Sequence, residues 1–258
     1  MKISILGHGV VGQAVERLLK PQYELVIYDP KYPDSKKDSV NSCELAIVCV
    51  PTNAKKDGSC DTSIVEEVLG WVKTPLVLIK STVPPEFLER IKRPGLCFSP
   101  EVIGESTYFT PYWKYPHPTE MKYHDFMIIG GEREDCTKII EFFLPVLGPS
   151  CRYMKTDLKT AALAKYMINS WGATKVTFCN EWYEIAKAQG VDYQELRELF
   201  LLDGRAERMH TFVHSENRGF GGKCFPKDVN ALVRFSAAAG YEPELLKEVI
   251  DSNEKFKK

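Results

Sequence analysis

The sequence has 258 residues, enough for one large domain or two small ones, and its 44% apolar and 27% charged residues are ordinary for a folded globular chain. The chain has 34 lysine and arginine residues and 35 aspartate and glutamate residues, a net charge of −1. Such a near-neutral balance does not indicate binding to nucleic acid or to an anionic membrane. No apolar stretch approaches the roughly 20 residues that a membrane span needs, and we expect no signal peptide, because the first apolar run leads directly into a glycine turn. We therefore expect a cytoplasmic protein whose partners include neither nucleic acid nor a membrane.

Eight cysteines are spread along the chain, and no two of them stand three residues apart. This spacing argues against a zinc ribbon and against a thioredoxin-type cysteine pair. A chain of this length without a secretion signal is typical of a compartment that keeps thiols reduced. We expect no metal site, and we interpret most of the cysteines as small buried apolar residues.

Short apolar runs alternate with helical patterns through the first half of the chain. The runs are rich in Val, Ile and Leu without polar alternation, which is typical of parallel strands covered on both faces. Helices are expected over 13–19 and 63–72, the second capped by Asp61 or Thr62. The alternation predicts an α/β fold, a Rossmann-type doubly wound parallel sheet. The expected strands are 3–6, 24–28, 45–50, 76–79 and 126–129.

Near residue 150 the pattern changes and the strands are expected to stop. Residues 158–189 carry apolar positions at helical spacing without a proline, which predicts one long helix. We therefore expect a Rossmann domain over 1–150 and an all-helical domain over 151–258. Further helices are expected over 193–201, 227–239 and 243–258.

A GxGxxG pattern follows the first strand and opens the first helix. In such a turn Gly7 allows a tight bend, Gly9 a close approach of the backbone to a pyrophosphate, and Gly12 close packing of helix on strand. Asp29 closes the second strand, where a carboxylate can accept from both ribose hydroxyls and would repel a 2′-phosphate. NAD is therefore favoured over NADP, although Lys31 tempers that preference. The alternative is a glycine turn in an α/β domain that binds no nucleotide. The expected contacts of the turn come from Gly7, Gly9, Val10, Val11 and Gly12.

The segment 218–228, RGFGGKCFPKD, is the most informative part of the sequence. Its glycines let the backbone approach a ligand, and Cys224 comes just before an expected helix N-terminus with Lys223 and Lys227 beside it. All three features favour a thiolate. A reactive thiolate beside a dinucleotide fold suggests oxidation through a covalent intermediate, whereas composition alone fits a structural cysteine equally well.

At this point the sequence resembles the UDP-glucose/GDP-mannose dehydrogenase family over essentially its whole length. The segment GFGGKCFPKD is similar to the nucleophile motif of that family almost letter for letter, and the other matching segments follow in the family's order. They are Val50-Pro51-Thr52 with 57–59 and 61–63, KSTVPP at 80–85, Ser99-Pro100-Glu101 with Glu105, and Lys165 with Asn169 followed by Asn180-Glu181.

The resemblance implies a four-electron oxidation of the primary alcohol of a nucleotide sugar to a carboxylate, with two NAD per turnover. UDP-glucose is the default substrate, and GDP-mannose and a UDP-hexosamine remain open. Cys224 would add to the aldehyde, and the thiohemiacetal would become a thioester that water cleaves. The base that takes the hydroxyl proton would be Lys165, Asp228 or a water between them.

Further roles carried over from the family fall on helix and loop residues. Lys165 and Asn169, one helical turn apart, would donate to the oxyanion, and Glu105 with Thr82 would position the water. Without the family context, Lys165 and Asn169 also fit a solvated helix face. Glu105 then fits a surface carboxylate, and Thr82 an ordinary hydroxyl at the end of a strand. The cofactor contacts implied are Pro51, Thr52 and Lys227, and the substrate contacts are Glu101 and Gly221.

The sequence departs from the family in two places. Family members usually continue for well over a hundred residues into a second α/β domain, so we expect the nucleotide-binding cover domain to be missing. The stretch 106–119 is longer than usual and holds five aromatic residues and three prolines. We expect either that it folds over the substrate or that it is a surface loop. The long helix implies a homodimer, since the family pairs through this element.

Two alternatives to this function remain. A β-hydroxyacid-type dehydrogenase shares the plan of a Rossmann domain followed by helices, but transfers one hydride without a cysteine. A catalytically silent NAD-binding subunit is the other, although it would not be expected to retain Cys224, Lys165, Asn169, Asp228 and Glu105 together.

Overall fold

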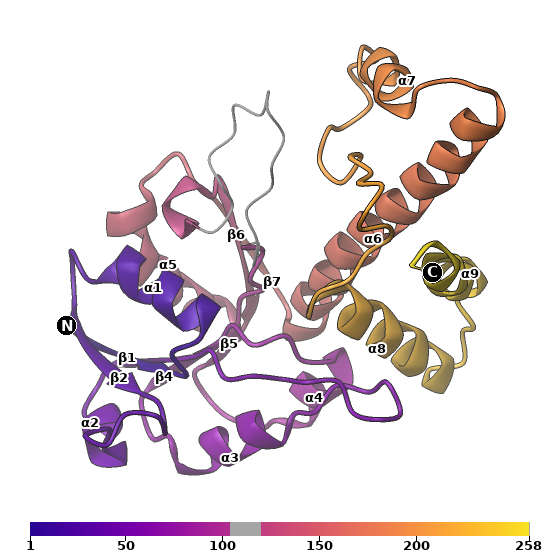
Figure 1. The fold of residues 1–258 in the computed structure, drawn as a ribbon. Coiled ribbons are helices and arrows are strands. Elements are labelled where there is room, and N and C mark those ends of the chain that lie inside the picture. The colour runs from indigo at the N-terminus through magenta and orange to yellow at the C-terminus, as the bar shows by residue number, and fades with distance from the viewer. Residues whose placement is uncertain (104–119, 258) are drawn as a thin grey trace. The chain divides into compact units, whose positions relative to one another are not determined.

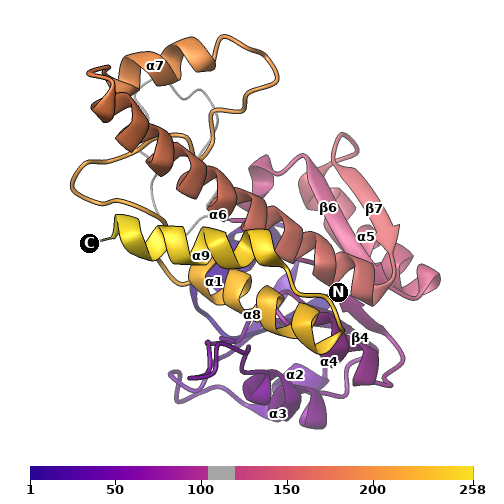
Figure 2. The same ribbon diagram turned by 90° about the vertical axis from the view of Figure 1, so that its right-hand side faces the viewer.

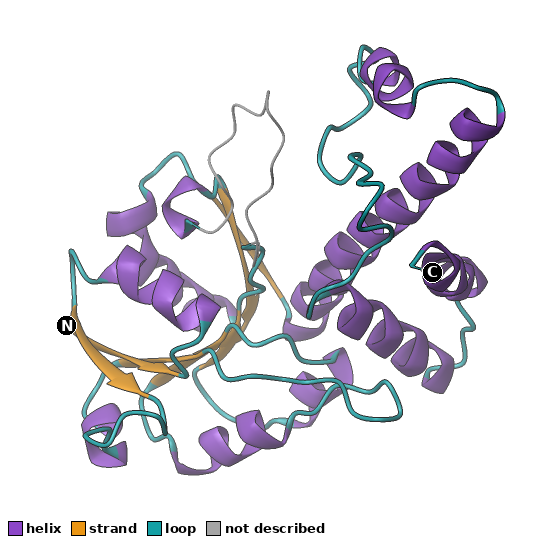
Figure 3. Ribbon diagram, viewed as in Figure 1, coloured by secondary structure: helices purple, strands orange, loops and turns teal. Residues whose placement is uncertain are grey.

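The computed structural model describes residues 1–103 and 120–257 (Figure 1). The chain divides into two compact units. Unit 1 comprises Met1–Asn53 and Asp61–Lys165, and unit 2 comprises Ala54–Cys60 and Tyr166–Lys258. Unit 1 holds the strands, whereas unit 2 is built from helices and loops (Figure 3).

Within the described residues, unit 1 contains a seven-stranded sheet of order β2-β1-β3-β4-β5-β6-β7. The first five strands of that order pair in parallel, with crossover helices between them, so the sheet is doubly wound. The strands are β1 (Lys2–Leu6), β2 (Glu24–Tyr28), β3 (Leu45–Val48), β4 (Leu76–Ile79), β5 (Leu96–Phe98), β6 (Phe126–Gly131) and β7 (Arg152–Thr156).

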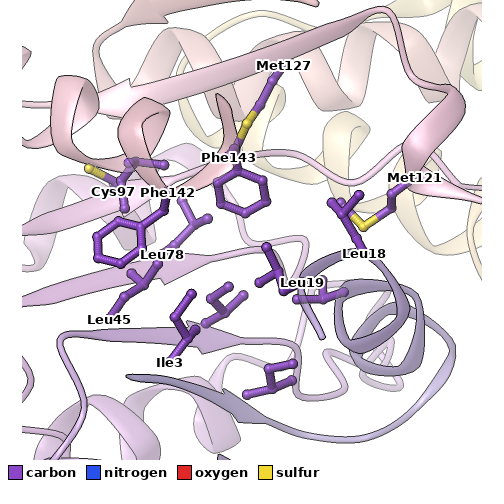
Figure 4. Close-up of a cluster of buried hydrophobic side chains, with 14 of the residues drawn as sticks. Ile3, Leu18, Leu19, Leu45, Leu78, Cys97, Met121, Met127, Phe142 and Phe143 are labelled. Atoms are coloured by element: carbon purple, nitrogen blue, oxygen red, sulfur yellow. The ribbon is translucent and has the colours of Figure 1, made fainter. Parts of the chain in front are cut away.

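Helices cover both faces of this sheet (Figure 1). Alternate residues of each central strand point to opposite faces, so Ile3, Ile5 and Ile47 join one apolar cluster while Ala46 and Val48 join the other. The first cluster lies under α1 and α5, and Figure 4 shows its aromatic and aliphatic side chains meeting across the strands. The helices of unit 1 are α1 (Val10–Leu19), α2 (Lys37–Asn41), α3 (Ser63–Trp71), α4 (Pro85–Arg90), η1 (Met121–Tyr123) and α5 (Arg133–Leu147).

The Rossmann-type fold expected from the sequence is confirmed, but the sheet differs in three ways: β5 and β7 were not expected, and one pair of strands is antiparallel. β5 and β6 pair antiparallel, since Cys97 faces Gly131 and Phe98 faces Gly130, so the sheet is not wholly parallel. A buried apolar run specifies a strand but not its direction, which is why the sequence pattern did not reveal this reversal.

The expectation that strands stop near residue 150 was wrong, because β7 follows that point. β7 is an edge strand with exposed and half-buried residues in the sequence RYMKT, so it lacks the apolar run by which the inner strands are recognised. As a result unit 1 extends to Lys165 and includes the first turns of the next helix, whose Ala161 and Ala162 pack in the second apolar cluster.

Unit 2 is formed largely by helices, as the sequence predicts. α6 (Leu158–Ala188) begins in unit 1 and runs on into unit 2, where it is followed by α7 (Tyr193–Phe200), α8 (Phe225–Ala238) and α9 (Glu244–Phe256). α8 and α9 lie along α6 (Figure 2), and a cluster of Ala173, Phe220, Val229 and Val249 joins these helices. No helix within the described residues combines the length and the apolar character needed to cross a membrane.

Candidate active site

The glycine turn between β1 and α1 has the geometry that its sequence predicts. Gly7 has φ +87°, a conformation that favours glycine, and a Cβ there would lie 2.8 Å from the Cys49 carbonyl oxygen. A Cβ on Gly12 would lie 2.1 Å from the carbonyl oxygen of Gly7, so the helix packs against its own turn too closely for any side chain. A Cβ on Gly9 would meet no atom within 4 Å. The turn is therefore tight at two glycines and open at the third.

The Asp29 carboxylate faces this turn from the end of β2. Oδ2 accepts from the His8 N–H at 2.7 Å, and Oδ1 accepts from the Lys31 N–H at 3.0 Å. Partial burial by itself would raise the pKa of Asp29, but these two N–H groups outweigh it and hold the pKa below the usual range. The carboxylate is thus fixed as an anion with lone pairs left for ribose hydroxyls.

The sequence analysis did not identify His8, whose imidazole contacts Glu16 of α1 and Tyr32 in the segment after β2. Nε2 lies 2.7 Å from Oε2 of Glu16 on α1, and Nδ1 lies 2.7 Å from the Tyr32 hydroxyl. A histidine at a variable position of the glycine pattern carries no signal that would reveal these partners.

An adenosine diphosphate group fits the residues that the structure places here. The open space at Gly9 lies beside the N-terminus of α1, whose N–H groups attract phosphate, and Val10 is nearly half exposed. The side chain of Thr52 is buried and Pro51 is exposed in the segment that follows β3. The expected cofactor residues of unit 1 therefore surround or follow the carboxyl ends of β1, β2 and β3, where dinucleotides bind in such sheets.

Glu101 is a buried residue of unit 1 that makes an ion pair and several hydrogen bonds. Its Oε2 lies 3.1 Å from Lys80 Nζ, both side chains being almost fully buried, and its Oε1 accepts from the N–H groups of Val102 and Ile103. Burial alone would raise the pKa of Glu101, but the charges of Lys80 and His124 and the hydrogen bonds to the carboxylate together outweigh it, so the pKa is lowered. The main-chain oxygen of Glu101 accepts from Lys165 Nζ at 2.5 Å. Glu101 thus links two lysines of the predicted motifs.

Of the two residues expected to position water, the structure describes Thr82 but not Glu105. Thr82 is half-buried three residues after the end of β4. Glu105 and the aromatic stretch 106–119 lie outside the described residues, so their expected roles remain predictions.

Cys224 stands in unit 2 at the N-cap of α8, with Pro226 in the first turn. It is the one cysteine of the eight that is not buried. Phe225 packs against Gly172 of α6, where a Cβ would lie 2.6 Å from its ring. The expectation that most of the cysteines are buried is confirmed, and Cys224 lies, partly exposed, at the start of a helix as its sequence position predicts.

Asp228, on the first turn of α8, is 2% exposed and accepts a hydrogen bond on each oxygen. Asn169 Nδ2 donates to Oδ2 at 2.5 Å, and Lys227 Nζ donates to Oδ1 at 2.6 Å. Unit 2 therefore brings together Asn169, Lys227 and Asp228, three of the residues predicted from the family motifs. Lys165, predicted to act beside Asn169, belongs to unit 1 and donates to Glu101.

The loop before Cys224 is held by two side chains that sequence reasoning did not assign. Asn253 of α9 accepts from the Phe220 N–H at 2.6 Å and donates to the Phe220 carbonyl at 3.0 Å. Asn180 of α6 accepts from the Gly219 N–H at 3.1 Å. Gly221, an expected substrate contact, has open space where a Cβ would stand.

His210 lies shortly before the segment 218–222 in the sequence, where a histidine is a candidate phosphate partner but more often has no functional role. Burial, and after it Lys175, lowers the pKa of His210 to about 4, so its ring is neutral at pH 7. The ring packs edge-on against Phe225 at 5.2 Å. A neutral imidazole packed against the first residue of α8 serves as packing rather than as a cation for phosphate.

Comparison with known proteins agrees with these motifs. The family model described as "UDP-glucose/GDP-mannose dehydrogenase family, central domain" matches residues 159–255. A UDP-glucose 6-dehydrogenase of Rickettsia bellii is 30% identical over 237 residues, which cover 86% of this chain and 52% of the relative. Most of the chain is therefore similar to members of the UDP-glucose/GDP-mannose dehydrogenase family, and residues 159–255 match the central domain of that family.

Other members and structures extend that comparison. A GDP-mannose 6-dehydrogenase of Pseudomonas savastanoi pv. phaseolicola is 28% identical over 84% of this chain and 52% of its own length. The structure of a UDP-glucose dehydrogenase from Pyrobaculum islandicum matches with a TM-score of 0.80 and 26% identity, covering 98% of this chain and 68% of that one. The chain spans about half the length of the curated relatives it matches.

One solved structure shares the fold from outside this family. The 3-hydroxyisobutyrate dehydrogenase of Mycobacterium tuberculosis matches with a TM-score of 0.72 over 98% of this chain and 92% of its own, at 15% identity. At that identity the likeness shows a common fold alone.

Proposed function

We propose that this chain oxidises the primary alcohol of a nucleotide sugar to the carboxylate with NAD, through a covalent intermediate on Cys224. The single observation that carries the proposal is the contrast among the cysteines: seven are buried, and the eighth, partly exposed, stands at the N-cap of the helix that carries Lys227 and Asp228 of the Asp–Asn–Lys network. A helix N-terminus favours the thiolate, which is the nucleophilic form.

NAD would be held by the glycine turn and by Asp29, with Thr52, Pro51 and Lys227 as further contacts. When bound, it would supply the hydride acceptor for both oxidation steps. The two N–H groups that fix the Asp29 carboxylate leave it poised to accept from ribose hydroxyls. The same anion would repel a 2′-phosphate, which supports NAD over NADP.

The residues of the chain would divide the chemistry as follows. A base, Lys165, Asp228 or a water between them, takes the hydroxyl proton as the alcohol becomes an aldehyde. The Cys224 thiolate then adds to the aldehyde carbon, and loss of a second hydride gives a thioester. Water placed by Thr82 and Glu105 cleaves the thioester and returns the thiolate.

Charge that develops on the carbonyl oxygen needs donors during addition and hydrolysis. Asn169 is a candidate, since its Nδ2 is directed at Asp228 in unit 2 and is held by α6. Lys165 is the other, and its ammonium is oriented by the Glu101 carbonyl. Glu101 and Gly221 would bind substrate.

The test is production of NADH by the purified chain with UDP-glucose, GDP-mannose and a UDP-hexosamine. We expect two NADH per carboxylate formed, and Cys224→Ser should reduce carboxylate formation at least 1,000-fold, the order that loss of a nucleophile costs. Cys43→Ser is the matched control, because Cys43 Sγ already donates to the Ser39 carbonyl as a hydroxyl would.

Other outcomes identify the alternatives. One NADH per product, unaffected by Cys224→Ser, would point to a β-hydroxyacid-type dehydrogenase, which the near-complete fold match to 3-hydroxyisobutyrate dehydrogenase keeps in view. Binding of NADH without turnover on any nucleotide sugar would point to a silent NAD-binding subunit.

We also propose that the chain forms a homodimer through α6. Several large apolar side chains of that helix are exposed, among them Met167 at 75%, Trp171 at 58% and Phe178 at 49%. Apolar surface of this kind, in excess of single scattered residues, is typical of an interface. Sedimentation should give twice the 29.3 kDa of the chain, and a stable monomer at micromolar concentration would contradict the dimer.

A further inference from the structure

The loop 218–222, called here the nucleophile loop, leads directly into Cys224. Two of its three glycines have positive φ, +72° at Gly219 and +74° at Gly222. Such a loop has many accessible conformations in the unfolded chain and needs contacts to select one. The contacts that select it come from two buried asparagines on two helices.

Asn253, on α9, binds both peptide groups of Phe220. Its Oδ1 accepts from the Phe220 N–H at 2.6 Å, and its Nδ2 donates to the Phe220 carbonyl at 3.0 Å. The residue is 1% exposed, so water does not compete for these bonds. A side-chain amide that pairs with a donor and an acceptor of one residue fixes both the position and the orientation of that residue.

The absence of a side chain at Gly219 is a second observation that points to the same contact. A Cβ at Gly219 would lie 2.6 Å from Asn253 Oδ1. The loop therefore approaches the amide as closely as a glycine allows.

Asn180, on α6, holds the two residues before Phe220. Its Oδ1 accepts from the Gly219 N–H at 3.1 Å and from Arg218 Nε at 2.7 Å. Its own Nδ2 donates to the Val176 carbonyl at 2.8 Å, which fixes the amide against its helix. Three consecutive loop residues are thus bonded to α6 or α9.

We propose that Asn253 and Asn180 are positioning residues for the Cys224 nucleophile, and we call the pair the amide clamp. The inference rests on the proposed function, in which the Cys224 thiolate attacks an aldehyde carbon. Neither asparagine acts on substrate. Each restricts the loop that sets where Cys224 begins α8, and misplacement of a reacting group by about 1 Å can cost a hundredfold in rate.

Hydrogen–deuterium exchange tests the clamp without any turnover. In Asn253→Ala the Phe220 amide loses its acceptor, so the 218–224 segment should exchange at least tenfold faster than in the unchanged chain. Asp251→Asn, an exposed position on the same helix, is the control and should leave that exchange unchanged. Equal exchange in Asn253→Ala and the unchanged chain would overturn the proposal.

Kinetics then separate a positioning role from a merely structural one. We expect kcat for NADH formation to fall at least tenfold in Asn253→Ala, while the Kd for NADH stays within twofold, because the glycine turn belongs to unit 1. A fall in kcat that only matches the loss of folded protein would overturn the positioning role.

Two further variants keep the test decisive if Asn253→Ala does not fold. Asn253→Asp keeps the acceptor for the Phe220 N–H and replaces the donor with an oxygen that faces the Phe220 carbonyl, so an effect of the same sign is expected. Gly219→Ala should act similarly, because its Cβ displaces the amide. Alkylation of Cys224 by iodoacetamide should slow in both, and unchanged alkylation with unchanged kcat in both would overturn the proposal.

Failure of the clamp and failure of the proposed function give different results. If the unchanged chain forms carboxylate and Cys224→Ser abolishes it, the function stands whatever the Asn253 variants do. If Cys224→Ser has no effect, the function fails, and the exchange measurement still reports whether the clamp holds the loop.

Discussion

The two glycine-rich segments of this chain are fixed in opposite ways. In unit 1 the turn at Gly7–Gly12 is set by main chain against main chain: the Gly7 N–H donates to the Tyr28 carbonyl at 2.8 Å, and Gly12 packs on the Gly7 carbonyl. In unit 2 the nucleophile loop is set by the side-chain amides of Asn180 and Asn253.

This difference matches what each segment is proposed to bind. A diphosphate is recognised by main-chain N–H groups at a helix N-terminus, so a turn defined by backbone sterics is sufficient. A nucleophile needs one side chain in one place, and side chains from separate helices can supply that precision. Substitutions should therefore act through sterics in the first segment and through lost hydrogen bonds in the second.

The largest effect is expected at Gly12. A Cβ there would lie 2.1 Å from the Gly7 carbonyl oxygen, and neither backbone can give way without moving α1 off β1. Gly12→Ala should lower the free energy of unfolding by about 3 kcal/mol, the upper end of the usual cost of overpacking, and should abolish NADH binding. Urea denaturation and a fluorescence titration with NADH measure the two quantities.

Gly9→Ala is the matched control, since its Cβ meets no protein atom within 4 Å and its φ is negative. We expect unchanged stability but at least a tenfold rise in the Kd for NADH, because the methyl group occupies the space proposed for the pyrophosphate. Unchanged NADH affinity in Gly9→Ala would show that no dinucleotide approaches this turn.

The contrast between the segments also explains what the sequence could reveal. Gly7, Gly9, Gly12 and Asp29 lie against neighbours that are close in the chain or on the adjacent strand, so a local pattern was sufficient to predict the geometry of the turn. Asn253 lies 33 residues from Phe220 and meets it only after α8 and α9 have packed. No spacing rule connects such residues, and the sequence therefore predicted Cys224 at the start of a helix but not the asparagines that hold the loop before it.

The same reasoning applies to the fold. Inner strands such as β1, β3 and β4 were predicted because burial on both faces demands apolar runs. β5, with three residues, and β7, at the edge, were missed because neither needs a long apolar run. α5 was not predicted, and it contains Pro145 in its last turn, where a proline disrupts few hydrogen bonds.

A similar loss of stability, without the loss of NADH binding that makes Gly12→Ala the larger effect, is expected at the buried ion pair of unit 1. Glu101→Gln leaves the Lys80 ammonium buried opposite a neutral amide, and breaking such a pair costs about 3 kcal/mol in unfolding free energy. The double variant Lys80→Met with Glu101→Gln should recover most of that loss, because it removes both charges. If the double variant is no more stable than Glu101→Gln, the pair is not the source of the loss.

The same pair predicts the pH dependence of stability. The pKa of Glu101 is lower in the folded chain than its usual value, so the unfolded chain binds the proton first as pH falls. The stabilisation is fully present above the unfolded pKa, near pH 4.5, and is lost as pH falls through the folded pKa. Urea denaturation between pH 7 and pH 3 should therefore show a steeper decline in the unchanged chain than in the double variant.

The smallest effect is expected for an ion pair of similar length in unit 2. Arg234 on α8 lies 3.3 Å from Asp57, in the segment 54–60 that belongs to unit 2, but both side chains are about half exposed. Water and salt screen such a pair, and the two long side chains lose rotamer freedom in forming it. Arg234→Gln should shift Tm by less than about 2 °C.

That segment has a stronger attachment in the packing of Cys60 against Tyr166 and Ala231. Because burial, not charge, attaches the segment to α6 and α8, Cys60→Ser should lower Tm more than Arg234→Gln does. If Arg234→Gln instead has the larger effect, the exposed ion pair is what holds residues 54–60. The contrast between the strong buried pair Lys80–Glu101 and the weak exposed pair Arg234–Asp57 would then fail.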